Sequence, residues 1–134
     1  MNQKKYTLKR LGQTGLVQQT DEARFTINYQ EELNPSQFEA ASSVNGCYLI
    51  IAGAGTGKTR TLVYRVARLI ELGHEPNSIL LLTFTRKAAN EMMKRASMLL
   101  DDRCSKIRGG TFHSFANLTL RKYAKAIGLD SSFT

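Results

Sequence analysis

The chain has 134 residues, which is long enough to bury a hydrophobic core within one domain. Hydrophobic residues make up 42% and charged residues 22% of it, as in an ordinary soluble protein, and the short apolar runs exclude a membrane-spanning helix. The net charge of +8 favours a polyanionic partner, either nucleic acid or an anionic membrane surface.

Residues 1–33 are predicted to form a polar, basic arm. No apolar segment follows the lysines of residues 1–10, so the arm is not a signal peptide, and we expect a cytoplasmic protein. Near the end of the arm, Phe25, Ile27 and Tyr29 alternate with polar residues. This alternation predicts one short, half-buried strand.

A helix start follows the arm. Asn34 is a favourable N-cap, Pro35 suits the first helical position, and Gln37 stands at the third position, as in a capping box. We expect this helix to continue to about Val44.

Two apolar runs predict buried strands, at Tyr48–Ala52 and Ser78–Phe84. The helix between them is expected to begin near Lys58 and to stop at Gly73. Its buried stripe is predicted to contain Leu62, Val66, Leu69 and Ile70.

The second half of the chain continues the alternation. A helix is predicted after Phe84, then a weaker strand at 106–112, and then a helix at 113–127 that ends at Gly128. The apolar stripe of the first of these helices contains Ala88, Ala89, Met92, Met93, Ala96, Leu99 and Leu100. Strands that alternate with helices predict an α/β fold with a parallel sheet.

The segment AGAGTGKT matches the Walker A phosphate-binding pattern, with alanine in place of its first glycine. Its three glycines permit backbone angles that aim N–H groups at a phosphate, and no side chain blocks the approach. A Gly-rich surface turn is the alternative, but the segment lies between a predicted strand and a predicted helix, as the motif requires. The expected phosphate-binding residues are Ala52, Gly53, Ala54, Gly55, Thr56, Gly57, Lys58 and Thr59.

Lys58 and Thr59 are the residues of this loop whose side chains carry the chemistry. The Lys58 ammonium is expected to reach the β- and γ-phosphates of a nucleoside triphosphate, and the Thr59 hydroxyl to ligate Mg²⁺. The helix that begins at Lys58 adds the positive end of its dipole. ATP with Mg²⁺ is therefore the predicted ligand.

Three further stretches accompany the P-loop: LNPSQ at residues 33–37, TFTRKAA at 83–89 and GTFHS at 110–114. In order and spacing they resemble the Q motif, motif Ia and motif Ib of UvrD/Rep-type superfamily 1 DNA helicases. The resemblance covers residue 33 to the C-terminus. It implies a RecA-like P-loop NTPase with a three-layer parallel sheet, and the helicase ATP-binding domain at 34–134 would be incomplete at its C-terminus.

For the nucleotide, the resemblance implies that Gln37 hydrogen-bonds the adenine edge and that Arg60 stacks on the adenine ring. A capping box alone would also explain Gln37, and an arginine on a solvated helix face would explain Arg60.

For DNA, the resemblance implies that Phe84 stacks on a base of single-stranded DNA, a contact that tolerates any sequence. A phenylalanine at the end of an apolar strand would otherwise belong to the core. Thr85, Thr111 and His113 are implied to hold DNA phosphates, although His113 is equally explained as a structural residue. Arg86 departs from the family, which has asparagine there, and its longer cation is expected to increase the attraction for phosphates.

Hydrolysis also needs a Walker B acid, a base and positive charge at the γ-phosphate. The apolar run before Asp101 and Asp102 continues a helical stripe, so these acids are expected to cap a helix end rather than to bind Mg²⁺. In the resembled family the acidic motif, the arginine fingers and the second RecA-like domain lie beyond this chain, and residues 131–134 are expected to begin another strand. We therefore expect an inactive fragment of a DNA repair or replication helicase.

Two alternatives remain. A different P-loop enzyme, such as a small kinase, would need a lid and an acceptor site, and neither is apparent. A non-enzymatic nucleotide- or single-stranded-DNA-binding module would be separated from a helicase motor by a turnover assay.

Overall fold

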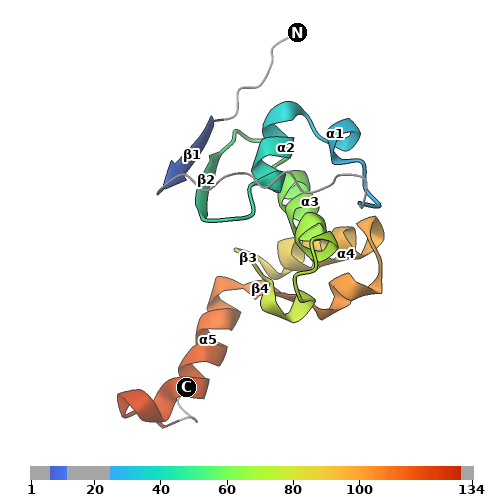
Figure 1. The fold of residues 1–134 in the computed structure, drawn as a ribbon. Coiled ribbons are helices and arrows are strands. Elements are labelled where there is room, and N and C mark those ends of the chain that lie inside the picture. Colours follow the sequence, from blue (N-terminus) through green and yellow to red (C-terminus); the bar gives the residue numbers. More distant parts are fainter. Residues whose placement is uncertain (1–6, 12–24, 131–134) are drawn as a thin grey trace.

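The computed structural model describes residues 7–11 and 25–130, and for residues 7–11 only the course of the backbone. After the arm, helices and strands alternate in the predicted order (Figure 1). In chain order the elements are β1 (Thr7–Leu11), α1 (Tyr29–Glu32), α2 (Pro35–Ser42), β2 (Cys47–Ile51), α3 (Lys58–Glu71), β3 (Leu80–Thr83), α4 (Arg86–Leu99), β4 (Arg108–Thr111) and α5 (Phe112–Tyr123). Short 3₁₀ helices lie at Pro76–Ser78, Asp102–Lys106 and Ala124–Ile127.

Strand pairing departs from the single parallel sheet that the sequence predicts. Within the described ranges, β3 and β4 form a parallel pair, whereas β1 and β2 form a separate antiparallel pair. The parallel sheet is therefore confirmed for β3 and β4, and the described residues do not extend it to the three-layer arrangement. The sequence TLKRL of β1 lacks an alternating pattern, so this strand was not predicted.

Strand β2 was expected to be buried, and that prediction is wrong. Leu49 and Ile51 point to one face of the strand and are 50% and 52% exposed. The residues that alternate with them, on the other face of the strand, are half-buried. Among the described strands, β2 pairs with β1 alone.

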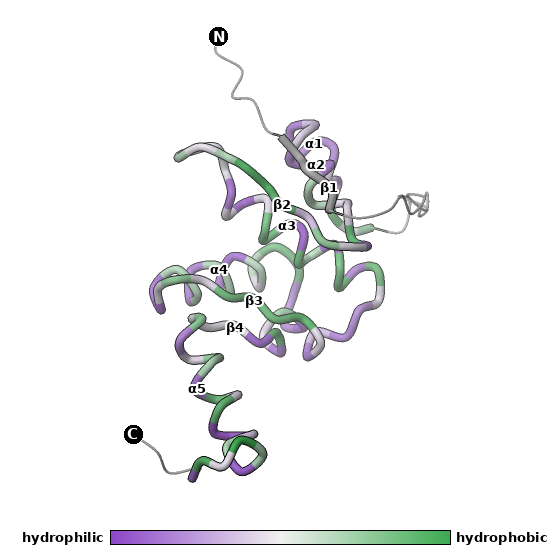
Figure 2. The backbone as a smooth tube through the Cα atoms, turned by 90° about the vertical axis from the view of Figure 1, so that its left-hand side faces the viewer, coloured by the Kyte–Doolittle hydropathy of each residue, from purple (hydrophilic) through white to green (hydrophobic). Residues whose placement is uncertain are grey.

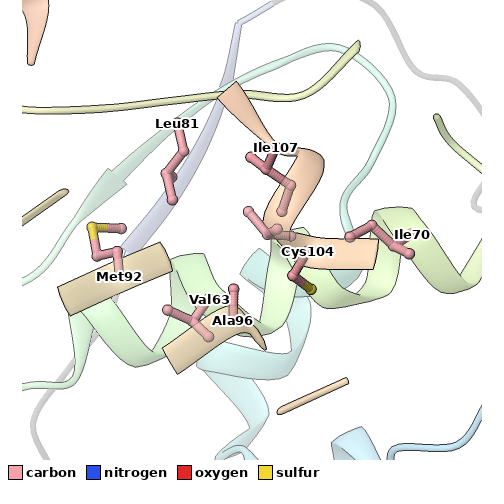
Figure 3. Packing of buried hydrophobic residues seen from close by; sticks show 8 residues of the cluster. Val63, Ile70, Leu81, Met92, Ala96, Cys104 and Ile107 are labelled. Carbon is pink, nitrogen blue, oxygen red and sulfur yellow. The ribbon is translucent and has the colours of Figure 1, made fainter. Parts of the chain in front are cut away.

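The main core lies between α3, α4 and the β3–β4 pair (Figure 3). Its buried residues come from α3, α4, β3, the 3₁₀ helix Asp102–Lys106 and the residue before β4, as expected for helices packed on a small sheet. Leu62, which was predicted to be in the stripe of α3, is instead 37% exposed, and Val63 takes the buried position. The buried members are Val63, Val66, Ile70, Leu81, Met92, Ala96, Cys104 and Ile107.

A second cluster joins α1 and α2 to the other face of α3, and it overturns the strand predicted at Phe25–Tyr29. The backbone of residues 25–28 is irregular, and Tyr29 begins α1. The Glu71 carboxylate of α3 holds this segment, because it accepts hydrogen bonds from the Thr26 N–H at 2.6 Å and from the Tyr29 hydroxyl. Phe25 and Ile27 still turn inward and pack on the cluster.

The boundary between arm and domain at residues 33 and 34 stays a prediction. Tyr29 and Leu33, which lie before it, are 3% and 4% exposed in the second cluster. Residues 25–33 are thus packed against the domain.

Helix α5 extends away from the α3–α4 body (Figure 1) and contacts β3 and β4 at its start. The predicted stop is confirmed, because the 3₁₀ turn after α5 ends at Gly128, whose φ is +74°. Hydrophobic and hydrophilic stretches alternate along its length (Figure 2). Among the described helices, none combines the length and apolar character needed to cross a bilayer. The strand expected at 131–134 lies outside the described residues.

Candidate nucleotide-binding site

The loop between β2 and α3 has the backbone that the P-loop pattern requires at two of its glycines. Gly55 and Gly57 adopt positive φ values of +71° and +90°, which favour glycine. At Gly57 a Cβ would also lie 2.6 Å from Nε2 of Gln37, so a side chain there would displace the Gln37 amide. Gly53 has no positive φ, so the expectation for it is corrected.

Lys58 lies against the loop itself. Its Nζ donates to the carbonyl oxygens of Ala52 at 3.1 Å and Gly53 at 2.8 Å. The Thr56 hydroxyl donates to the same Gly53 carbonyl at 2.7 Å. The ammonium is therefore held within the segment that the sequence assigns to phosphate.

The N-terminus of α3 differs from those of the neighbouring helices. In helices α2, α4 and α5 the N-cap side chains of Asn34, Thr85 and Thr111, respectively, each accept a hydrogen bond from a backbone N–H of the first turn. Helix α3 begins after Gly57, which has no side chain to do so. Uncapped N–H groups, the helix dipole and the Lys58 ammonium form a donor set that fits a phosphate anion.

Gln37 uses both ends of its amide. Its Oε1 accepts the Asn34 N–H at 3.1 Å, while Oδ1 of Asn34 accepts the Gln37 N–H at 2.9 Å, which confirms the capping box. Its Nε2 donates to the Thr56 carbonyl at 3.1 Å. Gln37 therefore connects the start of α2 to the P-loop, a role that the sequence pattern did not show.

Arg60, the first residue after the P-loop, contacts two residues that the sequence analysis missed. One of its terminal nitrogens (Nη2) donates to the Glu32 carboxylate at 2.6 Å and the Glu32 carbonyl at 2.8 Å. The same nitrogen lies 3.2 Å from the Tyr64 hydroxyl. The spacing of Arg60 and Tyr64, four residues apart on one helix, was the available signal for the second contact.

Thr59 lines a cavity of about 360 Å³ between α3 and α4. Lys87 and Thr85 line it too, so the P-loop and the TFTRKAA stretch meet at this cavity. Glu91 contributes an acid to the lining, and its carboxylate is paired with Arg95 at 2.8 Å.

The candidate DNA residues converge because β3 and β4 are parallel. Thr83 pairs with Thr111, so the carboxyl ends of both strands meet at one edge of the sheet. There, the Thr85 hydroxyl accepts the Ala88 N–H and the Thr111 hydroxyl accepts the Ser114 N–H, each at 3.1 Å. Two helix N-termini thus open side by side, which is the usual place for ligands on a parallel sheet.

Phe84 extends into solvent at this edge. Its side chain is 80% exposed, so the interpretation of Phe84 as a core residue is wrong. The His113 ring lies 6.4 Å from the Phe84 ring, at an interplanar angle of 74°. Arg86 is exposed beside them at the start of α4, and Phe112, which the sequence analysis did not single out, is 57% exposed at the start of α5.

The predicted helix cap is confirmed for Asp101, which caps the 3₁₀ helix Asp102–Lys106, whereas Asp102 is the first residue of that helix. The Asp101 carboxylate accepts the Arg103 N–H at 2.8 Å and pairs with the Arg103 guanidinium at 2.9 Å. The hydrogen bonds from Arg103 hold the pKa of this exposed carboxyl below its usual value. In the described residues no group of three His, Cys, Asp or Glu side chains is placed to hold a metal ion.

Residues 33–134 match the family model of the UvrD/REP helicase N-terminal domain. Two proteins called ATP-dependent DNA helicase PcrA are among the similar relatives. The one from Staphylococcus aureus (strain Mu50) is 44% identical over 103 residues, and the one from Leuconostoc citreum is 46% identical over 104 residues. Each alignment covers 76% of this chain and 14% of the relative, so the chain spans about one seventh of these relatives' length.

Proposed function

The chain belongs to the UvrD/REP helicase N-terminal domain family, and from this premise we propose that it forms the ATP-binding part of an ATP-dependent DNA helicase, a translocase on single-stranded DNA. The observation that supports this proposal most directly is the loop at residues 52–59. This loop combines glycines in the left-handed region, the Lys58 ammonium and a helix N-terminus without a side-chain cap. It also lies within the residues that match the family.

Each loop residue has a proposed role toward Mg-ATP. The N–H groups at the start of α3 and the Lys58 ammonium bind the β- and γ-phosphates, and the Thr59 hydroxyl is a ligand for Mg²⁺. Gln37 and Arg60 contact the adenine. Bound Mg-ATP supplies the free energy of phosphoanhydride cleavage.

The DNA track is proposed to run over the carboxyl ends of β3 and β4. Phe84 stacks on a base, while Arg86, Thr85, Thr111 and His113 hold phosphates at the paired helix N-termini. We likewise propose that the chain acts with the remaining helicase domains, that it binds single-stranded DNA and that it is cytoplasmic.

A matched pair of lysine variants tests the nucleotide site. Lys58→Ala is expected to abolish binding of a fluorescent ATP analogue in the presence of Mg²⁺, because it removes the charge at the phosphates. Lys94→Ala removes the same charge from an exposed position of α4 and is expected to bind as the wild type does. Equal affinity in all three proteins would contradict the proposal.

We expect no DNA-stimulated ATP hydrolysis by this chain alone. In the described part, the acid that lines the cavity beside Thr59 is Glu91, and Arg95 neutralises it. In this proposal the arginine finger belongs to another helicase domain, and such a residue contributes about 10³–10⁵ in rate in related chemistry. Phosphate release measured with and without single-stranded DNA checks this. Robust release that Glu91→Gln abolishes would show instead that the fragment is an enzyme with Glu91 as its acid.

A further inference from the structure

Arg60 is held by a network that reaches from the P-loop helix to α1. Its Nη2 donates to the carboxylate and to the backbone carbonyl of Glu32, at 2.6 and 2.8 Å. The Tyr64 hydroxyl donates to the same Glu32 carboxylate at 2.8 Å. The guanidinium carbon lies 4.9 Å from the centre of the Tyr64 ring. The guanidinium is thus held by oxygens and by a ring.

The network is anchored in the protein interior. Tyr64 is 6% exposed and packs edge-on against Tyr29, with ring centres 6.0 Å apart. Burial, together with the hydrogen bond to Glu32, raises the pKa of Tyr64, so it remains a neutral donor. Glu32 is followed by the buried Leu33 and ends α1, directly before the capping box of α2. Tyr64 is therefore fixed in the interior, whereas the Glu32 side chain is 50% exposed and is positioned by its place at the end of α1.

The side chain of Arg60 nevertheless remains 47% exposed. A planar guanidinium stacks on flat rings through its faces, and here the Tyr64 ring is on one side. An arginine that is ordered before binding loses less rotamer freedom when a ligand arrives than one that moves freely in solvent.

We propose that Glu32 and Tyr64 are positioning residues that hold the Arg60 guanidinium ready to stack on the base of a bound nucleotide. The inference rests on the proposed function, because it assigns Arg60 to the base and the P-loop to the phosphates. It adds that the network of Glu32, Tyr64 and Arg60 affects binding of the base, whereas Lys58 binds the phosphates.

Comparing the binding of ATP with that of inorganic tripolyphosphate, each with Mg²⁺, separates the contribution of the base from that of the phosphates. Glu32→Ala is expected to weaken ATP binding about fivefold to tenfold, as expected when a preordered contact is lost, and to leave tripolyphosphate binding unchanged. Glu32→Gln keeps an acceptor oxygen and is expected to lose less. Glu31→Ala removes the same charge from an exposed neighbouring position and is expected to bind both ligands normally.

A double variant gives the decisive readout. Once Arg60→Ala has removed the guanidinium, adding Glu32→Ala is expected to cause no further loss of ATP affinity. Three results would overturn the inference: unchanged ATP affinity in Glu32→Ala, a gain in ATP affinity, or parallel loss of both ligands with a lowered melting temperature. If the wild type binds neither ligand, the proposed function itself fails and the inference fails with it.

Discussion

Phe84 and Arg68 represent opposite departures from ordinary residue placement, because one is an exposed ring and the other a buried cation. Phe84 is 80% exposed at the sheet edge, while Arg68 is 5% exposed inside the domain. The exposed ring has a proposed ligand in a DNA base. The buried cation lies over the rings of Phe25 and Tyr29, at 4.5 and 5.1 Å from guanidinium carbon to ring centre.

Phe84→Ala is expected to weaken binding of a single-stranded oligonucleotide by about 1–3 kcal/mol, which is the usual contribution of a base–aromatic stack. Because the ring is exposed, the melting temperature should not fall. Fluorescence anisotropy over a range of salt concentrations separates this loss from the phosphate term, whose slope is about −0.7 per phosphate contacted. Met98→Ala, at a residue that is 77% exposed, is the control and should leave DNA binding intact. A lowered melting temperature in Phe84→Ala would place the ring in the core.

Arg68 is expected to be replaceable by methionine without loss of stability. Its Nε and Nη1 are buried and have no hydrogen-bond partner among the described residues. Such a cation costs desolvation energy, and replacement of buried charges by apolar side chains is often neutral or stabilising. Arg68→Met should therefore change the free energy of unfolding by between about 0 and +2 kcal/mol, as measured by urea denaturation. Arg68→Ala should lower it, because alanine leaves a cavity. A loss above about 1 kcal/mol in Arg68→Met would show that the aromatic rings stabilise the cation more than burial penalises it.

At the scale of elements, α1 shows how tertiary contacts stabilise a segment that is too short to stand alone. A helix of four residues has no independent stability, and α1 persists because Tyr29 and Leu33 are buried against its neighbours. The hydrogen bond from the Tyr29 hydroxyl to Glu71 links it to α3. Because the Tyr29 hydroxyl donates only while it is protonated, this contact makes the stability of the packing between α1 and α3 dependent on pH.

Stability is expected to fall at alkaline pH. Burial and the hydrogen bond to Glu71 raise the pKa of Tyr29, and Tyr64 is shifted in the same direction. Above about pH 10 an unfolded tyrosine loses its proton while a buried one keeps it, so the unfolding free energy decreases with pH, by up to about 1.4 kcal/mol per unit for one fully shifted group. Urea denaturation from pH 9 to 11.5 measures the slope. Tyr29→Phe should make it shallower, whereas Tyr123→Phe, at a residue that is 55% exposed, should not change it.

At the scale of the whole molecule, exposed apolar side chains gather on α5 and the strand faces. On α5, Phe112 and Leu118 are 57% and 69% exposed, and on the strands Ile51 and Leu80 are 52% and 43% exposed. Exposed apolar side chains that gather on a surface are typical of interaction sites, and strand edges that lack a partner recruit other chains.

We expect the chain to self-associate, even though its net charge of +8 opposes association. Sedimentation velocity and thermal melts over a concentration series would show this as a size and a melting temperature that rise with concentration. Leu118→Glu should reduce association. Ala116→Glu adds the same charge at an exposed position of α5 without removing a large apolar side chain, and it should have a smaller effect. A concentration-independent melt from a wild-type monomer would contradict the prediction.

The sequence by itself determined the order of helices and strands after residue 33, the capping box at Asn34 and the glycine loop before Lys58. Each of these depends on residues only a few positions apart, because a cap, a turn or a helical stripe is decided by local backbone geometry. The candidate DNA residues were named from the resemblance alone, and the parallel pairing of β3 and β4 in the structure places them at one sheet edge.

Only the tertiary structure decided which strand pairs with β2, how Phe25 and Tyr29 are buried, and what holds Arg60. These features join residues far apart in the chain: Arg60 and Glu32 are 28 positions apart, and Tyr29 and Glu71 are 42 apart. Local periodicity does not specify a partner that is distant in the chain. A strand pattern indicates which face is apolar but not which element covers that face. Packing against α3 determines these partners. One face of α3 buries the main core and the other buries the second cluster, which brings α1 next to Arg60, the residue that follows the P-loop.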